Sequence, residues 1–205
     1  MIIAVDGPAA SGKGTLARRL AAHLGLAYLD TGAIYRAIAL KVLELGGSPQ
    51  DEETAVMAAK AYGPQLYPDA LLRTEAVSKA SSIVAAHKKV RAEVIGIQRK
   101  VAHTPPGAVL DGRDIGTIVC PDAEVKFYVT ASPEERARRR WRELQERGQD
   151  GIYADILEEI VRRDERDRTR PVAPLKAASD AHLLDTTSLD IEATFQAARR
   201  IVDGR

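Results

Sequence analysis

Met-Ile-Ile-Ala-Val-Asp-Gly-Pro-Ala-Ala-Ser-Gly-Lys-Gly-Thr, residues 1–15, is the stretch that decides the fold. Residues 2–5 are apolar and mostly β-branched, which predicts a buried strand that stops at a turn. A glycine-rich loop follows over residues 7–13, and residues 14–24 have the pattern of a helix. A strand, a glycine-rich loop, a lysine and a helix in this order predict a phosphate-binding loop.

The residue types of this loop suit an anion. Gly7 and Gly12 allow the backbone to curl so that successive N–H groups point inward. The helix N-terminus adds partial positive charge, and Lys13 reaches the outer phosphates as a mobile cation. The strict pattern has Ser or Thr directly after the lysine, whereas here Gly14 follows and the hydroxyl comes at Thr15. The alternative is an ordinary strand–turn–helix corner without a ligand, and the flanking strand and helix favour the phosphate loop.

The composition is that of a globular protein of 205 residues, of which 45% are apolar and 29% are charged. A net charge of +1 gives no reason to expect nucleic acid or an anionic membrane as a partner. The lone cysteine, Cys120, suggests a reducing compartment. We find no signal peptide and no apolar run of membrane-spanning length, so the cytoplasm is the expected location.

Strands and helices alternate along the rest of the chain. This alternation predicts an α/β fold with a central parallel sheet covered by helices on both faces. Further strands are predicted at residues 26–29, 108–111, 125–129 and 181–184. Helices are predicted at residues 33–45, 51–63, 75–86, 90–101, 133–147, 154–167 and 191–202, and residues 66–72 are predicted to be a loop. We expect one domain with a core of residues 1–49, 104–137 and 173–205 and two inserts, residues 50–103 and 138–172.

Polar clusters follow the strands, and ligands of open α/β sheets bind beyond the carboxyl ends of the strands. The clusters are Asp6-Gly7, Asp30-Thr-Gly32, Asp111-Gly-Arg-Asp114 and Thr130-Ala-Ser132. A carboxylate such as Asp111 after an apolar strand resembles the acid that helps to hold magnesium in nucleotide-binding folds. The alternative is a carboxylate that forms a turn or caps a helix.

The arginines are a second indication of a site for phosphoryl groups. A phosphoryl donor and its acceptor both carry negative charge, so a flexible arginine-bearing flap could neutralise that charge and exclude water on closing. A solvated helix face is the favoured interpretation for Arg138, Arg142, Arg147 and Arg162. The arginines in or beside the candidate segments are Arg36, Arg91, Arg113, Arg136, Arg139, Arg140, Arg163, Arg166, Arg168 and Arg170.

Four stretches together resemble the bacterial cytidylate kinases. They are residues 7–15, Leu29-Asp-Thr-Gly-Ala-Ile-Tyr-Arg36, Asp111-Gly-Arg-Asp-Ile-Gly-Thr117 and Arg163-Asp-Glu-Arg-Asp-Arg-Thr-Arg-Pro-Val-Ala-Pro-Leu175. The resemblance covers nearly the whole chain. It implies a P-loop nucleoside monophosphate kinase fold that moves the γ-phosphate of ATP onto CMP or dCMP with Mg²⁺. Such kinases generally carry Gly-Lys-Gly-Thr and hold the ion largely through waters, so Gly14 fits the family.

The resemblance also implies roles at matching positions. ATP would be bound by Gly7, Pro8, Ala9, Ala10, Ser11, Gly12, Lys13, Gly14, Thr15 and Arg139. CMP would be bound by Thr31, Tyr35, Arg36, Ser82, Arg91, Arg113, Asp114, Arg163, Asp167 and Arg170. The catalytic charges would be Lys13, Arg113, Arg140, Arg166 and Arg170. Thr15 and Asp111 would contact the ion, largely through water. Residues 50–103 would form the acceptor-binding insert, and residues 138–172 an arginine-rich lid that Arg136 and Arg139 belong to or flank.

Within the CMP set, Arg36, Arg113 and Arg170 match positions that grip the acceptor phosphate. Arg163 and Asp167 match those that bind the sugar hydroxyls. Ser82, Arg91 and Asp114 match those that read cytosine. A carboxylate can accept from the cytosine amino group, whereas uracil would oppose it with a carbonyl oxygen.

The chain departs from related sequences in one respect. They usually have a longer insert after the Tyr-Arg helix, with an asparagine-containing hairpin turn, and this chain has no asparagine. We therefore expect a shortened acceptor-binding insert. The expected partners are small nucleotides, and we expect a monomer.

The sequence leaves three other functions to compare with this one. A kinase of the same fold could act on UMP, AMP or a small alcohol, because a fold does not fix a substrate. A non-catalytic nucleotide-binding switch is the less favoured alternative. Guanine-specific switches read the base with an Asn-Lys-x-Asp motif, which a chain without asparagine cannot have. A nucleic-acid-binding module on the basic helix near residues 136–142 is disfavoured by the interleaved glutamates and the near-neutral net charge. No histidine is placed as a nucleophile, which favours direct in-line transfer.

Overall fold

The structure is a computed structural model and describes residues 1–63 and 67–204. The chain divides into two compact units. The first comprises Met1–Tyr28 and Ala102–Arg205, and the second comprises Leu29–Val101. No helix in the described parts of the chain is long and apolar enough to cross a membrane.

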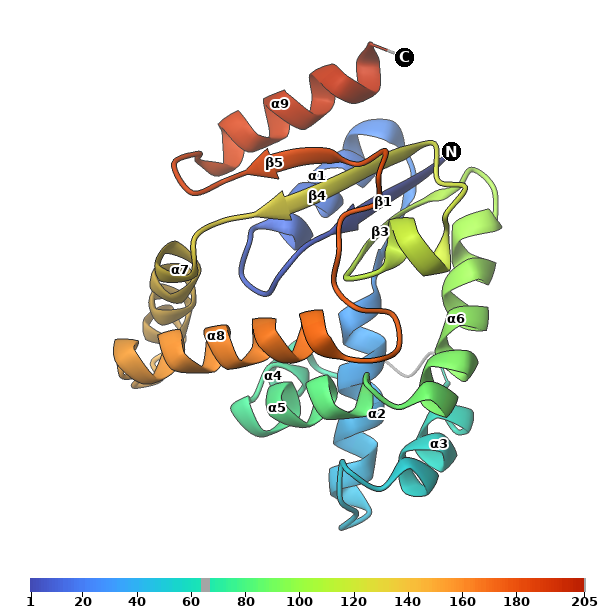
Figure 1. The fold of residues 1–205 in the computed structure, drawn as a ribbon, viewed down its shortest axis with the longest axis vertical. Coiled ribbons are helices and arrows are strands. Elements are labelled where there is room, and N and C mark those ends of the chain that lie inside the picture. Colours follow the sequence, from blue (N-terminus) through green and yellow to red (C-terminus); the bar gives the residue numbers. More distant parts are fainter. Residues whose placement is uncertain (64–66, 205) are drawn as a thin grey trace. The chain divides into compact units, whose positions relative to one another are not determined.

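The strands form one sheet with the order β2-β3-β1-β4-β5 (Figure 1). β1 pairs in parallel with β3 and β4, and β4 pairs in parallel with β5. The predicted α/β fold with a central parallel sheet is confirmed. The strands are β1 (Ile2–Asp6), β2 (Ala27–Asp30), β3 (Ala108–Gly112), β4 (Val125–Thr130) and β5 (His182–Asp185).

The register brings the carboxyl ends of the central strands together. Asp6 of β1 lies opposite Gly112 of β3 and Tyr128 of β4, and Thr130 of β4 lies opposite Asp185 of β5. All five residues of β1 and of β3 are buried, as expected for strands covered on both faces. Polar residues that follow these strands are therefore held at one edge by a rigid scaffold.

The helices of the first unit begin with α1 (Lys13–Leu24) and end with α9 (Ile191–Asp203). These two helices pack on the sheet through one apolar cluster that includes Leu20, Phe127 and Phe195. Burying each of these side chains contributes about 2–3 kcal/mol. The unit also contains η1 (Ile115–Val119), α7 (Pro133–Glu146) and α8 (Tyr153–Thr169), and α7 and α8 pack together (Figure 1).

The start of α7 follows the sequence signal. The Ser132 hydroxyl accepts a hydrogen bond from the Glu135 N–H at 3.2 Å, and Pro133 occupies the first turn. Glu134 and Glu135 add negative charge at the positive end of the helix.

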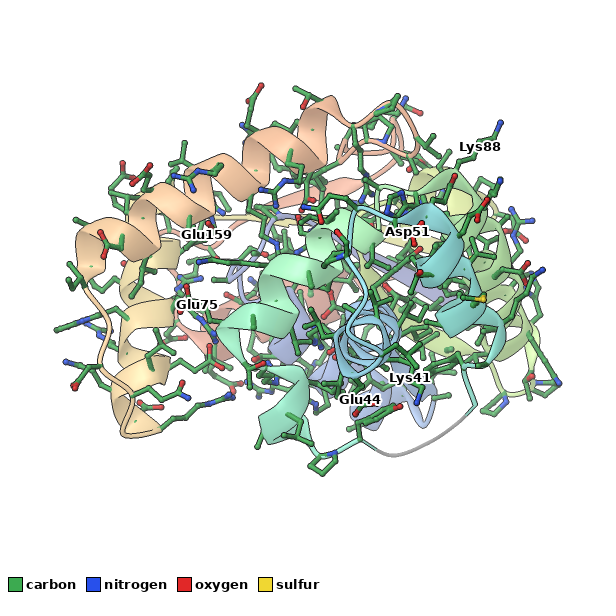
Figure 2. All side chains as sticks on the ribbon, turned by 90° about the horizontal axis from the view of Figure 1, so that it is seen from below. Lys41, Glu44, Asp51, Glu75, Lys88 and Glu159 are labelled. Atoms are coloured by element: carbon green, nitrogen blue, oxygen red, sulfur yellow. The ribbon has the colours of Figure 1, made fainter. Side chains whose placement is uncertain are left out.

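The second unit is helical, and its core includes Ile34, Ile38 and Val42 of α2. At the exposed end of α2, the Lys41 ammonium lies 3.6 Å from the Glu44 carboxylate (Figure 2). The helices are α2 (Thr31–Glu44), α3 (Glu52–Lys60), α4 (Asp69–Leu72), α5 (Glu75–Val84) and α6 (Lys88–His103), of which the last two residues belong to the first unit.

Several sequence-based boundaries were wrong. The loop predicted over residues 66–72 contains α4, which begins directly after Pro68 and is supported by a hydrogen bond from Arg73 Nε to Asp69 at 2.8 Å. Residue 66 of the predicted loop lies outside the described residues. The helix predicted over residues 51–63 ends at Lys60, where the Ala61 N–H closes a last turn onto Met57. The other predicted elements differ by no more than three residues at either end, and η1 was missed.

Candidate active site

The predicted phosphate loop joins β1 to α1, and two of its glycines have φ angles that other residues rarely adopt. φ is +152° at Gly7 and +87° at Gly12. A Cβ added at Gly7 would lie 1.9 Å from the Val129 carbonyl oxygen. Gly12 is the N-cap of α1, so the free N–H groups of the first helical turn open toward the loop. The loop therefore has the geometry of an anion site.

Lys13, the first residue of α1, is held by a carboxylate from β3. Its ammonium lies 3.5 Å from Asp111, and both side chains are largely buried. A Cβ added at Gly14 would lie 2.8 Å from the Asp111 Oδ2. The absence of a side chain at Gly14 thus allows Asp111 to approach Lys13, which explains why glycine follows the lysine.

Asp6 connects the end of β1 to the turn after β3. Its two carboxylate oxygens accept hydrogen bonds from the N–H groups of Ile115 and Gly116, both at 2.8 Å. Burial raises the pKa of Asp6 to about 7, although these two N–H groups lower it. The carboxylate caps the start of η1 and fixes the direction of the preceding residues, Arg113 and Asp114.

Arg113 and Asp114 form ion pairs with residues at the carboxyl end of α8 and directly after it. The Nε atom of Arg113 lies 3.0 Å from Asp167, and an Nη atom of Arg170 lies 3.6 Å from Asp114. The Arg170 Nε also donates to the Ala173 carbonyl at 2.7 Å. The structure therefore brings together four of the predicted CMP-binding residues within the first unit.

Asp167 is surrounded by positive charge. Burial opposes its ionisation, but Arg113, Arg163 and Arg170 hold the pKa of Asp167 below its ordinary value of 3.8. Asp164 lies one turn before Asp167 on the same helix, so the buried charges of α8 recur every three residues.

The other predicted arginines lie in different surroundings. Arg139 donates to the Thr186 hydroxyl at 2.9 Å and to its carbonyl at 2.6 Å. A Cβ added at Gly12 would lie 3.7 Å from Arg139, so this arginine is beside the phosphate loop. Arg140 pairs with Glu143 on its own helix at 2.8 Å. Arg166 is half-buried on α8.

The predicted residues of the second unit form two groups. Asp30 caps α2 by accepting from Ala33 at 3.1 Å and pairs with Arg36 at 2.7 Å. A Cβ at Gly32 would lie 3.0 Å from Arg36, so glycine makes room for the guanidinium. The Arg91 guanidinium lies 5.7 Å from the centre of the Tyr35 ring. Thr31 and Ser82 are buried.

Comparison with known proteins identifies the chain. Residues 3–203 match the family described as cytidylate kinase. The chain belongs to the cytidylate kinase family. A cytidylate kinase of Rhodopseudomonas palustris (strain BisA53) is 57% identical over 203 residues, which cover 99% of this chain and 96% of that protein. A cytidylate kinase of Afipia carboxidovorans (strain ATCC 49405 / DSM 1227 / KCTC 32145 / OM5) is 54% identical over 203 residues, which cover 99% of this chain and 97% of that protein.

A solved structure supports the fold. The shikimate kinase from Bacteroides thetaiotaomicron is similar with a TM-score of 0.52 at 14% identity, covering 99% of this chain and 98% of that chain. This likeness concerns the fold alone. The resemblance to the cytidylate kinases seen in the sequence is confirmed by the family match, whereas the individual site residues and the insert boundaries stay predictions.

Around the phosphate loop of this cytidylate kinase family member, sequence reasoning missed one residue, Thr186, and missed the contacts that Arg136 and Asp6 make. Thr186 follows the carboxyl end of β5 and contacts Arg139 and Ser11. The rule that ligands bind beyond strand ends could have found it, had it been applied to the last strand. The pairing of Arg136 with Asp164 and the capping role of Asp6 had no such signal, because both depend on contacts between distant segments.

The residues beside Lys13 suit a magnesium ion that is bound mainly by the nucleotide. Within residues 1–63 and 67–204, no three His, Cys, Asp or Glu side chains form a metal-binding group. Asp111 and Thr15 offer hard oxygen ligands at the start of α1. Mg²⁺ typically keeps several waters and is held by one or two carboxylates together with substrate phosphates, so this donor set fits it.

Gly7→Ala is expected to destabilise the chain by about 3 kcal/mol or more, because the new Cβ collides with the backbone of β4 and φ is unfavourable. Urea unfolding measures this loss. Gly148→Ala is the matched control, since Gly148 has φ +65° and no atom within 4 Å of the added Cβ. It is expected to cost only about 1 kcal/mol. Equal losses for the two variants would contradict the steric argument.

Stability is expected to depend on pH through Asp167. Its pKa is lowered in the folded chain, so its contribution is fully present above the ordinary value of 3.8 and is lost as pH falls through the folded value. The difference in unfolding free energy between wild type and Asp167→Asn should therefore be constant near neutral pH and shrink below about pH 4. Urea unfolding from pH 7 to pH 3 measures it, and a difference that grows on acidification would contradict the assignment.

Proposed function

We propose that this chain transfers the γ-phosphate of ATP to CMP or dCMP, giving ADP and CDP or dCDP. The observation that carries the proposal is the match to cytidylate kinases over nearly the whole chain. The phosphate loop and the buried Lys13 supply the donor half of this chemistry. The expected partners are the nucleotides alone, with the chain acting as a cytoplasmic monomer that binds no nucleic acid or membrane.

The donor half works through positioning and charge. The N–H groups of the loop would hold the ATP phosphates, and Lys13 would neutralise charge that develops on the transferred phosphoryl group. Mg²⁺, when bound with ATP, neutralises phosphate charge, and Asp111 and Thr15 would orient its waters. Asp111 has a second task, because it holds the Lys13 ammonium in place.

The acceptor half uses the buried charges of the Gly-Arg-Asp turn and α8. Arg113 and Arg170 would neutralise the acceptor phosphate, and Arg36, in the second unit, stays a prediction for the same role. Asp114 would accept from the cytosine amino group. An acceptor phosphate oxygen is already anionic at pH 7, so transfer needs no general base and is proposed to proceed in line, without a phosphoenzyme.

Release of ADP from magnesium-ATP, measured with CMP, dCMP, UMP and AMP in turn, tests the function. CMP and dCMP are expected to give the highest kcat/KM. A higher value for UMP or AMP would assign the chain to another acceptor. Isolation of a phosphorylated chain that passes its phosphate to CMP would exclude in-line transfer.

A further inference from the structure

The phosphate loop contains a strained residue between two tethered carbonyl groups. Ala10 has φ +59°, a left-handed conformation that is energetically unfavourable for a residue with a Cβ such as alanine. Such strain persists only where the surroundings hold it in place. The carbonyls on either side, those of Ala9 and Ser11, each accept a hydrogen bond from a buried side chain.

Arg136 of α7 holds the first carbonyl. Its guanidinium donates to Ala9 at 3.2 Å, to Ala131 at 2.9 Å and to both oxygens of Asp164 at 3.1 and 2.5 Å. Only 1% of Arg136 and 3% of Asp164 are exposed. The carboxylate neutralises the buried charge and fixes the plane of the guanidinium, which leaves another N–H directed at the loop.

Thr186, after β5, holds the second carbonyl. Its hydroxyl donates toward Ser11 at 3.0 Å and lies 3.1 Å from the carbonyl of Thr130. The same oxygen accepts from Arg139 at 2.9 Å, and 2% of the residue is exposed. The position of the hydroxyl is therefore fixed from several sides.

We propose that Arg136, held by Asp164, and Thr186 are positioning residues that keep the phosphate loop in its anion-binding shape. The C=O and N–H of a trans peptide point in opposite directions. Tying back the carbonyls of Ala9 and Ser11 therefore aims the N–H groups of Ala10 and Gly12 the other way, toward the inside of the loop. The proposal deepens the proposed function and rests on it, because the anion is taken to be the ATP phosphates.

Thr186 allows a conservative test. Calorimetric titration with magnesium-ATP is expected to show about tenfold weaker binding to Thr186→Val, which has the same shape without the hydroxyl. Thr186→Ser keeps the hydroxyl and is expected to bind as the wild type does. Wild-type affinity in Thr186→Val would overturn the proposal.

Arg136 is tested by exchanging both members of the buried pair, because removing one would leave an unpaired charge. Replacing such a pair by apolar residues often leaves stability unchanged, so Arg136→Met with Asp164→Leu is expected to fold. It should bind magnesium-ATP about tenfold more weakly. Arg162→Met on the exposed face of α8 is the matched control.

The outcomes separate a positioning role from a structural one. A folded double variant that binds ATP as the wild type does would show that the pair only supports packing, and would overturn the proposal. Where the double variant does not fold, the two Thr186 variants decide. Titration with ATP needs no acceptor, so it tests the positioning role independently of the acceptor. A wild type that binds ATP but releases no ADP with CMP would overturn the proposed function and leave the positioning proposal standing.

Discussion

Lys13→Ala is expected to lower kcat by about 1000-fold or more while the chain stays folded. Removing a single preorganised donor from the position where charge develops costs about 100- to 1000-fold in other enzymes, and here the missing group also carries a full charge. The buried Lys13 ammonium lies 3.5 Å from Asp111 and at the start of α1. ADP release with magnesium-ATP and CMP measures the loss.

The variant should fold because Asp111 keeps a second positive neighbour. The charge of Asp111 acts on Arg113, whose pKa it helps to raise against the effect of burial. A melting curve close to that of the wild type would confirm this. Lys41→Ala, at an exposed position on α2, is the matched control and is expected to keep full activity. A folded Lys13→Ala variant with wild-type kcat would remove the phosphate loop from the proposed mechanism.

The sequence predicts the sheet well because its strands are short, apolar and bounded by clear turn residues. The glycines of the phosphate loop are equally clear in the sequence. Gly7 and Gly12 both have positive φ angles, and a Cβ at Gly7 would also collide with Val129. Helix α7 is predicted at its start because Ser132 and Pro133 act locally. In each case the pattern that allows the prediction lies in neighbouring residues, although the contact that requires glycine at position 7 comes from Val129 of β4.

What the sequence does not predict depends on contacts between distant segments. The turn η1 forms where Asp6, more than one hundred positions earlier, caps two N–H groups. The sequence around Arg136 is typical of a solvated or lid arginine. The residue is nevertheless buried, because the Asp164 carboxylate neutralises its charge. Ionic pairs of this kind have no periodicity and no fixed spacing, so pattern analysis places such residues only in a general region.

Asp114→Asn is expected to reduce the preference for CMP over UMP by about tenfold or more. The amide has the shape of the carboxylate but offers N–H donors as well as an oxygen acceptor. It can therefore face the carbonyl oxygen of uracil, which the carboxylate opposes. A well-placed polar contact to a base edge discriminates by about 1–3 kcal/mol, which corresponds to roughly fivefold to 150-fold. The ratio of kcat/KM for CMP to that for UMP measures the change.

The effect should be confined to the acceptor. Asp114 is buried, lies 3.6 Å from Arg170 and belongs to the turn between β3 and η1 rather than to the phosphate loop. The KM for ATP is therefore expected to change by less than about twofold. Asp114→Ala removes the acceptor oxygen altogether and should weaken CMP far more than ATP. Asp122→Asn, at an exposed carboxylate, is the control. Equal weakening of both nucleotides by Asp114→Ala would mean that Asp114 does not read the base and instead supports Arg170 and the turn.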